Sequence, residues 1–227
     1  MAALCLCRFK GLVSGRRGSV PIRCSLGVRL LLELEEVHRI RTDRTVPQGR
    51  DELRLRSRHG WRARPGCKIF VADRGAVRFD YPEDWVVRPD NDSVNLYDQE
   101  PPDDDSRLTV SYVRLPPVDW SGLPVTALVE AGMRGDERAI QMWGPIREAR
   151  RDDLELAWRE VTFLDPAARR EARSRVCIAR RSTLQCLMTF DFWASDLERC
   201  DAAWETVLDT LQLDEFIADP TRGPAVS

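Results

Sequence analysis

The sequence predicts an α/β (α+β) fold, a sandwich in which one antiparallel β-sheet carries helices packed on both faces. Strands of alternating polarity follow one another through short turns, which favours antiparallel pairing. Several strands carry apolar side chains on both faces, so both faces need cover. Two amphipathic helical segments lie too far apart in the chain to cover only each other, and each is expected to pack on the sheet.

An apolar-polar alternation that ends at a proline marks the start of the domain. Val77, Phe79 and Tyr81 point to one side of an extended segment, which is the period of a half-buried strand. Pro82 removes the next strand donor and restricts the residue before it, so the strand should end there. Trp85 is then expected to return the chain to the core as a large buried anchor.

The other elements follow in sequence order. The predicted strands cover residues 68–71, 76–81, 93–97, 107–115, 146–151, 154–164, 170–180 and 183–193. The first two should form a hairpin around the turn that ends at Gly75. One helix is predicted over 123–134, and a second follows Ser195, which forms a capping box with Glu198 and precedes an apolar helical stripe up to Leu211.

This order of elements, with the motif Phe-x-Tyr-Pro-x-x-Trp from Phe79 to Trp85, resembles the PsbP-like superfamily. That superfamily includes the photosystem II extrinsic protein and the Ran-binding Mog-type import factor. The resemblance covers residues 68–213 and implies a PsbP-like sandwich that acts as a small binding or accessory module without catalysis. No residues match the photosystem protein's metal ligands or a Ran-binding surface, so neither role is transferred to this chain.

Charge divides the chain into two parts. Residues 1–66 hold 15 basic and 6 acidic residues, a net charge of +9, and the other 161 residues hold 20 basic and 31 acidic, a net of −11. This asymmetry indicates a basic tail joined to an acidic globule. We expect a basic, disordered extension over 1–66, a PsbP-like α/β domain over 67–215, and a flexible C-terminal tail over 216–227.

The basic extension fits several functional hypotheses incompletely. A transit peptide should lack acids, but acidic residues begin at Glu33. A twin-arginine signal at Arg16-Arg17 lacks an unbroken apolar stretch, and a nucleic-acid arm lacks interleaved aromatic residues. A disordered extension without a targeting role is the simplest interpretation.

The residue types in the globule exclude several kinds of catalysis. From Cys67 to Ser227 there is no histidine, and the motifs of phosphate-binding loops, dinucleotide sites and serine hydrolases are missing. We therefore predict that the protein is not an enzyme and needs no cofactor. The alternative is a small-ligand binder or a carboxylate-based enzyme with its site between sheet and helix.

Two charged clusters are candidate sites. The loop after the third strand could offer carboxylate oxygens to a hard cation, or could be a solvated loop without a metal; its acidic residues are Asp98, Glu100, Asp103, Asp104 and Asp105. Arginines crowd the strand over 170–180 and could bind an anionic partner, or could form cross-strand ion pairs with Glu155 and Glu160. The partner-binding candidates are Arg173, Arg175, Arg180 and Arg181.

The sequence thus predicts a protein-binding or assembly (adaptor) module whose partner is another protein. Nucleic acid is not an expected partner of the acidic globule. No apolar stretch reaches the length of about 20 residues that spans a bilayer, and buried cysteines without zinc-site spacing favour a cytoplasmic location. An adaptor requires an exposed apolar patch, whereas the ligand-binding alternative requires a closed pocket.

Overall fold

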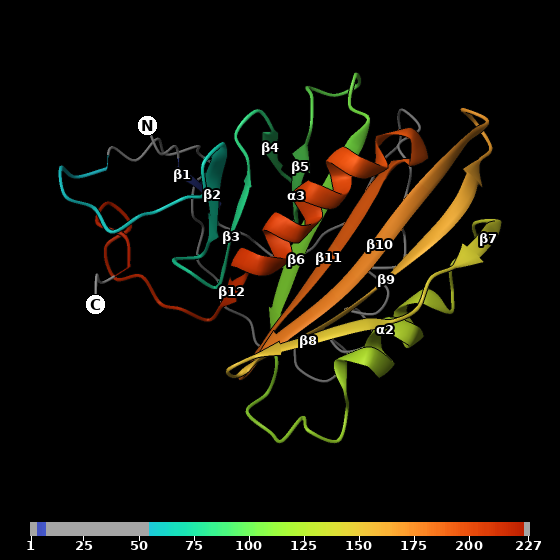
Figure 1. Cartoon of the computed structure of the whole chain (residues 1–227). Coiled ribbons are helices and arrows are strands. Elements are labelled where there is room, and N and C mark those ends of the chain that lie inside the picture. Colours follow the sequence, from blue (N-terminus) through green and yellow to red (C-terminus); the bar gives the residue numbers. More distant parts are fainter. Residues whose placement is uncertain (1–3, 8–54, 225–227) are drawn as a thin grey trace.

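The computed structural model describes residues 4–7 and 55–224 (Figure 1). In this part of the chain, most strands belong to an eight-stranded antiparallel sheet. Its order is β4 (Val86–Pro89), β5 (Val94–Tyr97), β6 (Ser106–Arg114), β11 (Leu184–Trp193), β10 (Arg170–Arg181), β9 (Leu154–Asp165) and β7 (Ile140–Trp143), and β8 (Arg147–Arg151) also pairs with β9. The antiparallel sheet is therefore confirmed.

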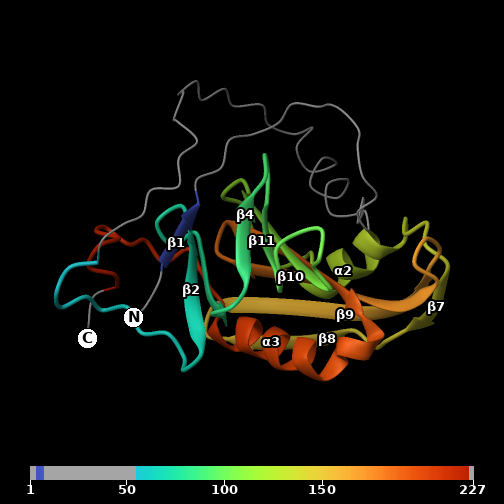
Figure 2. The ribbon, with the colours of Figure 1, turned by 90° about the horizontal axis from the view of Figure 1, so that it is seen from above.

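A second sheet lies at one end of the eight-stranded sheet (Figure 2). Its order is β1 (Leu4–Cys7), β2 (Cys67–Ala72), β3 (Val77–Pro82) and β12 (Gln212–Leu213), with β1 parallel to β2 and the other pairs antiparallel. The expectation of a single sheet was wrong. Pro82 ends β3 as predicted, but β4 then joins another sheet, and β3 pairs with the chain that follows the last helix.

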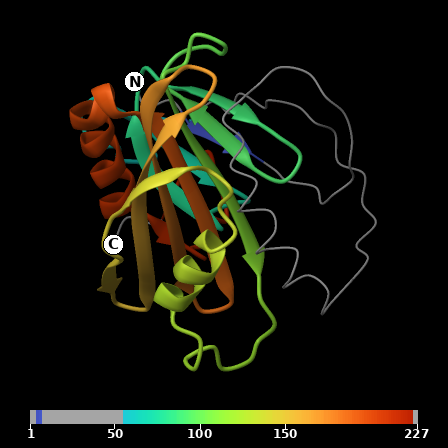
Figure 3. The ribbon, with the colours of Figure 1, turned by 90° about the vertical axis from the view of Figure 1, so that its right-hand side faces the viewer.

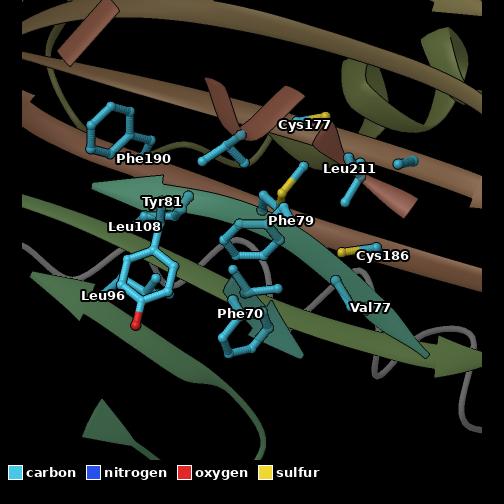
Figure 4. Packing of buried hydrophobic residues seen from close by; sticks show 14 of the residues in the cluster. Phe70, Val77, Phe79, Tyr81, Leu96, Leu108, Cys177, Cys186, Phe190 and Leu211 are labelled. Atoms are coloured by element: carbon cyan, nitrogen blue, oxygen red, sulfur yellow. The ribbon is translucent and has the colours of Figure 1, made fainter. Parts of the chain in front are cut away.

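The predicted strand residues Val77, Phe79 and Tyr81 lie in the main apolar core (Figure 4), to which Trp85 also belongs. Phe79 is fully buried and stacks on Phe70 with ring centroids 4.7 Å apart. Trp85 is buried as expected, with its ring centroid 5.8 Å from that of Phe190 in β11. The segment around Pro82 therefore connects the hairpin to the larger sheet through aromatic contacts.

Two α-helices occur in the described residues, α2 (Val125–Met133) and α3 (Leu197–Thr210). A short 3-10 turn, η1 (Ala194–Asp196), precedes α3, so Asp196 becomes the residue before the helix. The predicted capping box was wrong, because Ser195 donates its hydroxyl to Asp196 and no side chain caps the helix.

The helices contact different residues of β10. Val176 and Ile178 belong to a cluster with the apolar face of α2, whereas Cys177 and Ala179 belong to the main core with α3. Alternate residues of a strand point to opposite faces of its sheet. The strand therefore contributes to two separate apolar clusters.

The segments just outside the predicted domain boundaries pack on each other. Trp61 is buried and donates its indole N–H to the Pro220 carbonyl at 2.8 Å, and Gly60 donates to the Arg222 carbonyl at 2.6 Å. Ile217 belongs to the same apolar cluster as Trp61. The boundaries after residues 66 and 215 stay predictions. The hypotheses about the basic extension concern mainly residues 8–54, which lie outside the described part of the chain. Residues 1–3 and 225–227 also lie outside it.

Candidate protein-binding site

One side edge of the eight-stranded sheet is open. β7 and β8 both pair with β9, one after the other along its length, and neither has a second strand partner in the part of the chain described. β7 lies at the end of the molecule opposite the four-stranded sheet, and β8 runs back toward β12 of that sheet (Figure 1). An open edge presents unpaired backbone N–H and C=O groups to which another strand can bind.

Large exposed apolar side chains gather at this edge. Met142 of β7 is 53% exposed, Trp143 is 43% exposed, and Leu164 near the end of β9 is 46% exposed. Two other large apolar residues among those described share this exposure, Val118 in the loop before α2 and Phe216 after β12. Three of the five therefore lie around the β7 edge.

The break between β7 and β8 fixes the position of Trp143. Gly144 donates its N–H to the Glu160 carbonyl at 2.9 Å, and a Cβ at Gly144 would lie 3.0 Å from that oxygen. Arg159 donates to the Gly144 carbonyl at 2.7 Å, and its guanidinium lies 4.8 Å from the Trp143 ring centroid. The indole is thus held at the edge by a cation-π contact while much of its surface remains exposed.

Two of the predicted partner-binding arginines lie on the same face of β10. Arg173 bonds to Glu160 at 2.6 Å, and Arg175 bonds to the other oxygen of Glu160 at 2.7 Å and also to Asp201 of α3. The Arg175 side chain is 3% exposed. Its guanidinium contacts three aromatic rings, those of Trp158, Phe192 and Trp204.

The other two predicted arginines lie near the far end of β10. Arg180 bonds to Glu155 at 2.6 Å and to the Leu123 carbonyl at 2.9 Å. Arg181 bonds to the Leu213 carbonyl at 2.8 Å and forms ion pairs with Asp153 and Glu215. The four arginines do not form one patch, and the pairs with Glu155 and Glu160 that the alternative interpretation predicted are present. Their role in partner binding stays a prediction.

The acidic loop is held by contacts within the fold. Asp98 is buried, accepts the backbone N–H groups of Asp105 and Ser106 at 3.0 Å, and forms an ion pair with Arg199 at 2.7 Å. Burial raises the pKa of Asp104.

Two other acids of this loop lie beside arginines. Glu100 pairs with Arg88, and Asp105 lies 3.8 Å from Arg170. In residues 55–224, no three His, Cys, Asp or Glu side chains lie together in a way that could hold a metal ion.

The exposed residues at the β7 edge were missed by sequence reasoning. The segment Ile140–Trp143 is only four residues long and has no clear two-residue period. The signal that could have found it is the Gly144-Pro145 pair, which interrupts a strand-forming stretch next to two large apolar residues.

The fold is an α/β domain similar to that of the PsbP-like proteins of known structure. The solution structure of cyanobacterial PsbP (CyanoP) from Synechocystis sp. PCC 6803 matches with a TM-score of 0.50 at 13% identity, covering 70% of this chain and 98% of that one. The Ran-binding protein Mog1p of Saccharomyces cerevisiae matches with a TM-score of 0.43 at 10% identity, covering 65% of this chain and 95% of that one.

Sequence similarity identifies the family more narrowly. The model of the Alr1449 family matches residues 68–217, and the chain belongs to this family. A Nostoc sp. (strain PCC 7120) protein named "Uncharacterized protein alr1449" is 40% identical over 177 residues, which cover 78% of this chain and 92% of the relative. In residues 4–7 and 55–224, no helix is both long enough and apolar enough to cross a membrane.

Proposed function

We propose that this chain is a non-catalytic protein-binding or assembly module and that its partner docks on the open edge formed by β7 and β8. The observation that carries the proposal is the grouping of Met142, Trp143 and Leu164 around that edge. Exposed apolar side chains next to unpaired strand groups are typical of sites where a partner adds a strand. The partner would be a segment of another protein in extended conformation.

The proposed module is a sandwich in which the two helices cover opposite faces of the large sheet. The alternation of β10 residues between the two apolar clusters supports this arrangement, as do the positions of α2 and α3 in Figure 3. Both faces would then be occupied by the protein's own helices, which favours the side edge as the place for a partner.

Side chains at the edge fit this mode of binding. Met142 is paired with Thr162 of β9 and Trp143 with Val161, so the two exposed side chains point to opposite faces of the sheet. An added strand also directs its side chains alternately to both faces. It would therefore cover Met142 on one face and Trp143 on the other.

The alternative of a ligand site between sheet and helix has less support. The carboxylates of Glu160 in β9 and Asp201 in α3 are both bonded to Arg175 of β10. Aromatic rings fill the space around that guanidinium. A cytoplasmic location stays a prediction; the thiols of Cys177, Cys186 and Cys200 are buried and free.

The test uses the full chain and a neutral strand-forming peptide, Ac-Thr-Val-Gln-Val-Thr-Gln-Val-Thr-amide. We expect binding with a dissociation constant of about 1 mM or tighter, with NMR shift changes confined to β7, β8 and β9. The double variant Met142→Lys/Trp143→Lys should lose this binding, because charged side chains on an edge strand oppose strand addition. Val118→Lys, which replaces an equally exposed apolar residue away from the edge, should bind as the wild type does.

NMR shift changes outside β7, β8 and β9 would refute the docking site. So would a peptide affinity that the double variant Met142→Lys/Trp143→Lys leaves unchanged. Circular dichroism of each variant ensures that a loss of binding is not a loss of fold.

A further inference from the structure

Some arginines of the eight-stranded sheet form ion pairs with carboxylates, and others do not. Ion pairs are present for arginines on β4, β6 and β10, and Arg159 on β9 donates to a backbone carbonyl. The paired arginines of β10 are Arg170, Arg173, Arg175, Arg180 and Arg181. On β8, Arg147 and Arg150 are both exposed. Within residues 55–224 neither forms an ion pair, and Arg147 instead lies over the ring of Trp158.

The third arginine of β8 has a role within the fold. Arg151 donates to the carbonyls of Leu208 and Leu211, at 2.6 and 3.2 Å, and to that of Asp209, all near the C-terminal end of α3. A cation at this end of a helix is stabilising, because the terminal carbonyls carry partial negative charge. The unmatched charges are therefore those of Arg147 and Arg150, on the open edge itself.

The residues from β7 through β8 carry a net charge of +2, from three arginines and Glu148, although the whole chain carries −2. We infer that the segment that adds to this edge is acidic, with two carboxylates that pair with Arg147 and Arg150. This inference rests on the proposed function, and it names the chemistry of the partner strand.

The spacing of the two arginines defines the spacing of the carboxylates. In the register of β8 and β9, Arg147 lies opposite Trp158, and Arg150 lies opposite Glu155, whose carboxylate is bonded to Arg180. The two arginines are three residues apart and therefore point to opposite faces of the sheet. Side chains on the neighbouring strand that lie directly opposite are about 5 Å away, within reach of an ion pair. The partner strand should therefore carry acidic residues at positions i and i+3.

Arg147 is held in a position suited to this contact. Its guanidinium lies 4.9 Å from the ring centroid of Trp158, and that of Arg175 lies 5.5 Å from the same centroid. A stacked guanidinium keeps its N–H groups available at the rim of the ring, where a carboxylate can accept two of them. A second copy of this chain matches the edge less well, because β8 carries three arginines and one glutamate and so cannot offer a carboxylate to each arginine.

The experiment compares the acidic peptide Ac-Thr-Val-Glu-Val-Thr-Glu-Val-Thr-amide with its neutral glutamine counterpart, both titrated into the full chain at low salt. We expect the acidic peptide to bind the wild type about fivefold more tightly, the range given by two exposed ion pairs. The variant Arg147→Gln/Arg150→Gln should bind both peptides equally. Arg134→Gln, an exposed arginine beyond α2, is the matched control and should keep the preference.

The outcomes separate this inference from the proposed function. If both peptides bind at β7 and β8 with equal affinity, the edge is a docking site but the acidic partner is wrong. If neither peptide binds, the proposed function fails as well. A preference for the acidic peptide that survives in the variant Arg147→Gln/Arg150→Gln would also overturn the inference. Dimerisation through β8 in solution would overturn it too, because the occupant of the edge would then be a second copy of this chain.

Discussion

The two edges of the eight-stranded sheet are built in different ways. At one edge, β4 is short and ends at Pro89, which has no N–H to offer, while Val87 is buried and Arg88 pairs with Glu100. At the other edge, β7 has no charged residue and exposes Met142 and Trp143. Prolines, charges and short strands are the usual protection of an edge against adding another strand. β4 and β7 are both four residues long, so the difference between them lies in the proline and the ion pair of β4 and in the exposed apolar side chains of β7. This difference supports a binding role for β7.

The largest difference between the edges should appear on truncation of apolar side chains. Leu96→Ala, in the strand next to β4, removes a fully buried side chain and should lower the free energy of unfolding by about 2–5 kcal/mol. Met142→Ala should change it by less than about 0.5 kcal/mol, because half of that side chain is already exposed. Urea denaturation of both variants measures the contrast. Equal losses would mean that Met142 supports the fold and is not held available for a partner.

A smaller difference should appear for two threonines. Thr109 donates its hydroxyl to Asn95 at 2.7 Å beside the protected edge, so Thr109→Val should cost about 1 kcal/mol. Thr162, the cross-strand neighbour of Met142, is 5% exposed, and its hydroxyl has no partner among the described residues. Thr162→Val removes a buried polar group that lacks a hydrogen bond and should stabilise the free protein by about 1 kcal/mol.

Thermal and urea unfolding of the two valine variants checks this opposite sign. A loss of stability in Thr162→Val would show that the hydroxyl has a structural role, and the contrast between the two ends of the sheet would then disappear. Thr162→Ser keeps the hydroxyl and serves as the control for the change in side-chain shape.

The sequence was informative where local chemistry decides the structure. Pro82 and Trp85 marked the end of one strand and the return to the core, because a missing N–H and a large indole act within a few residues. The division into two sheets was not predictable in this way. It depends on β3 pairing with residues of β12, more than 130 positions later in the chain.

The candidate site was harder to predict, because exposure is a property of the folded chain. Arg173 and Arg147 are the same kind of residue on β10 and β8, the two strands that flank β9, and no local pattern distinguishes them. The structure does so, because Glu160 lies within 2.6 Å of Arg173 while Arg147 has a tryptophan ring and no carboxylate beside it. Which arginines remain unpaired therefore depends on tertiary placement of the acids.

The smallest predicted effect is a pH dependence at the protected edge. Tyr97 of β5 is paired with Val86 of β4, and burial raises its pKa above the ordinary value, although nearby Arg107 acts in the opposite direction. The unfolded chain ionises this phenol near pH 10, before the folded chain does. Ionisation therefore favours the unfolded state, and the contribution of Tyr97 to stability is present below about pH 10 and is lost as the pH rises through its folded pKa.

Tyr97→Phe removes this titration, so the stability difference between wild type and variant should shift in favour of the variant as the pH rises from about 8 to about 11. Urea denaturation at the two pH values measures it. Tyr112, whose pKa is also raised by burial and by its hydrogen bond to Asp73, is present in both proteins and cancels in the difference. A stability difference that does not change with pH would mean that the phenol of Tyr97 is as accessible in the folded chain as in the unfolded one. The β4 edge would then be less closed than its buried valine and its proline indicate.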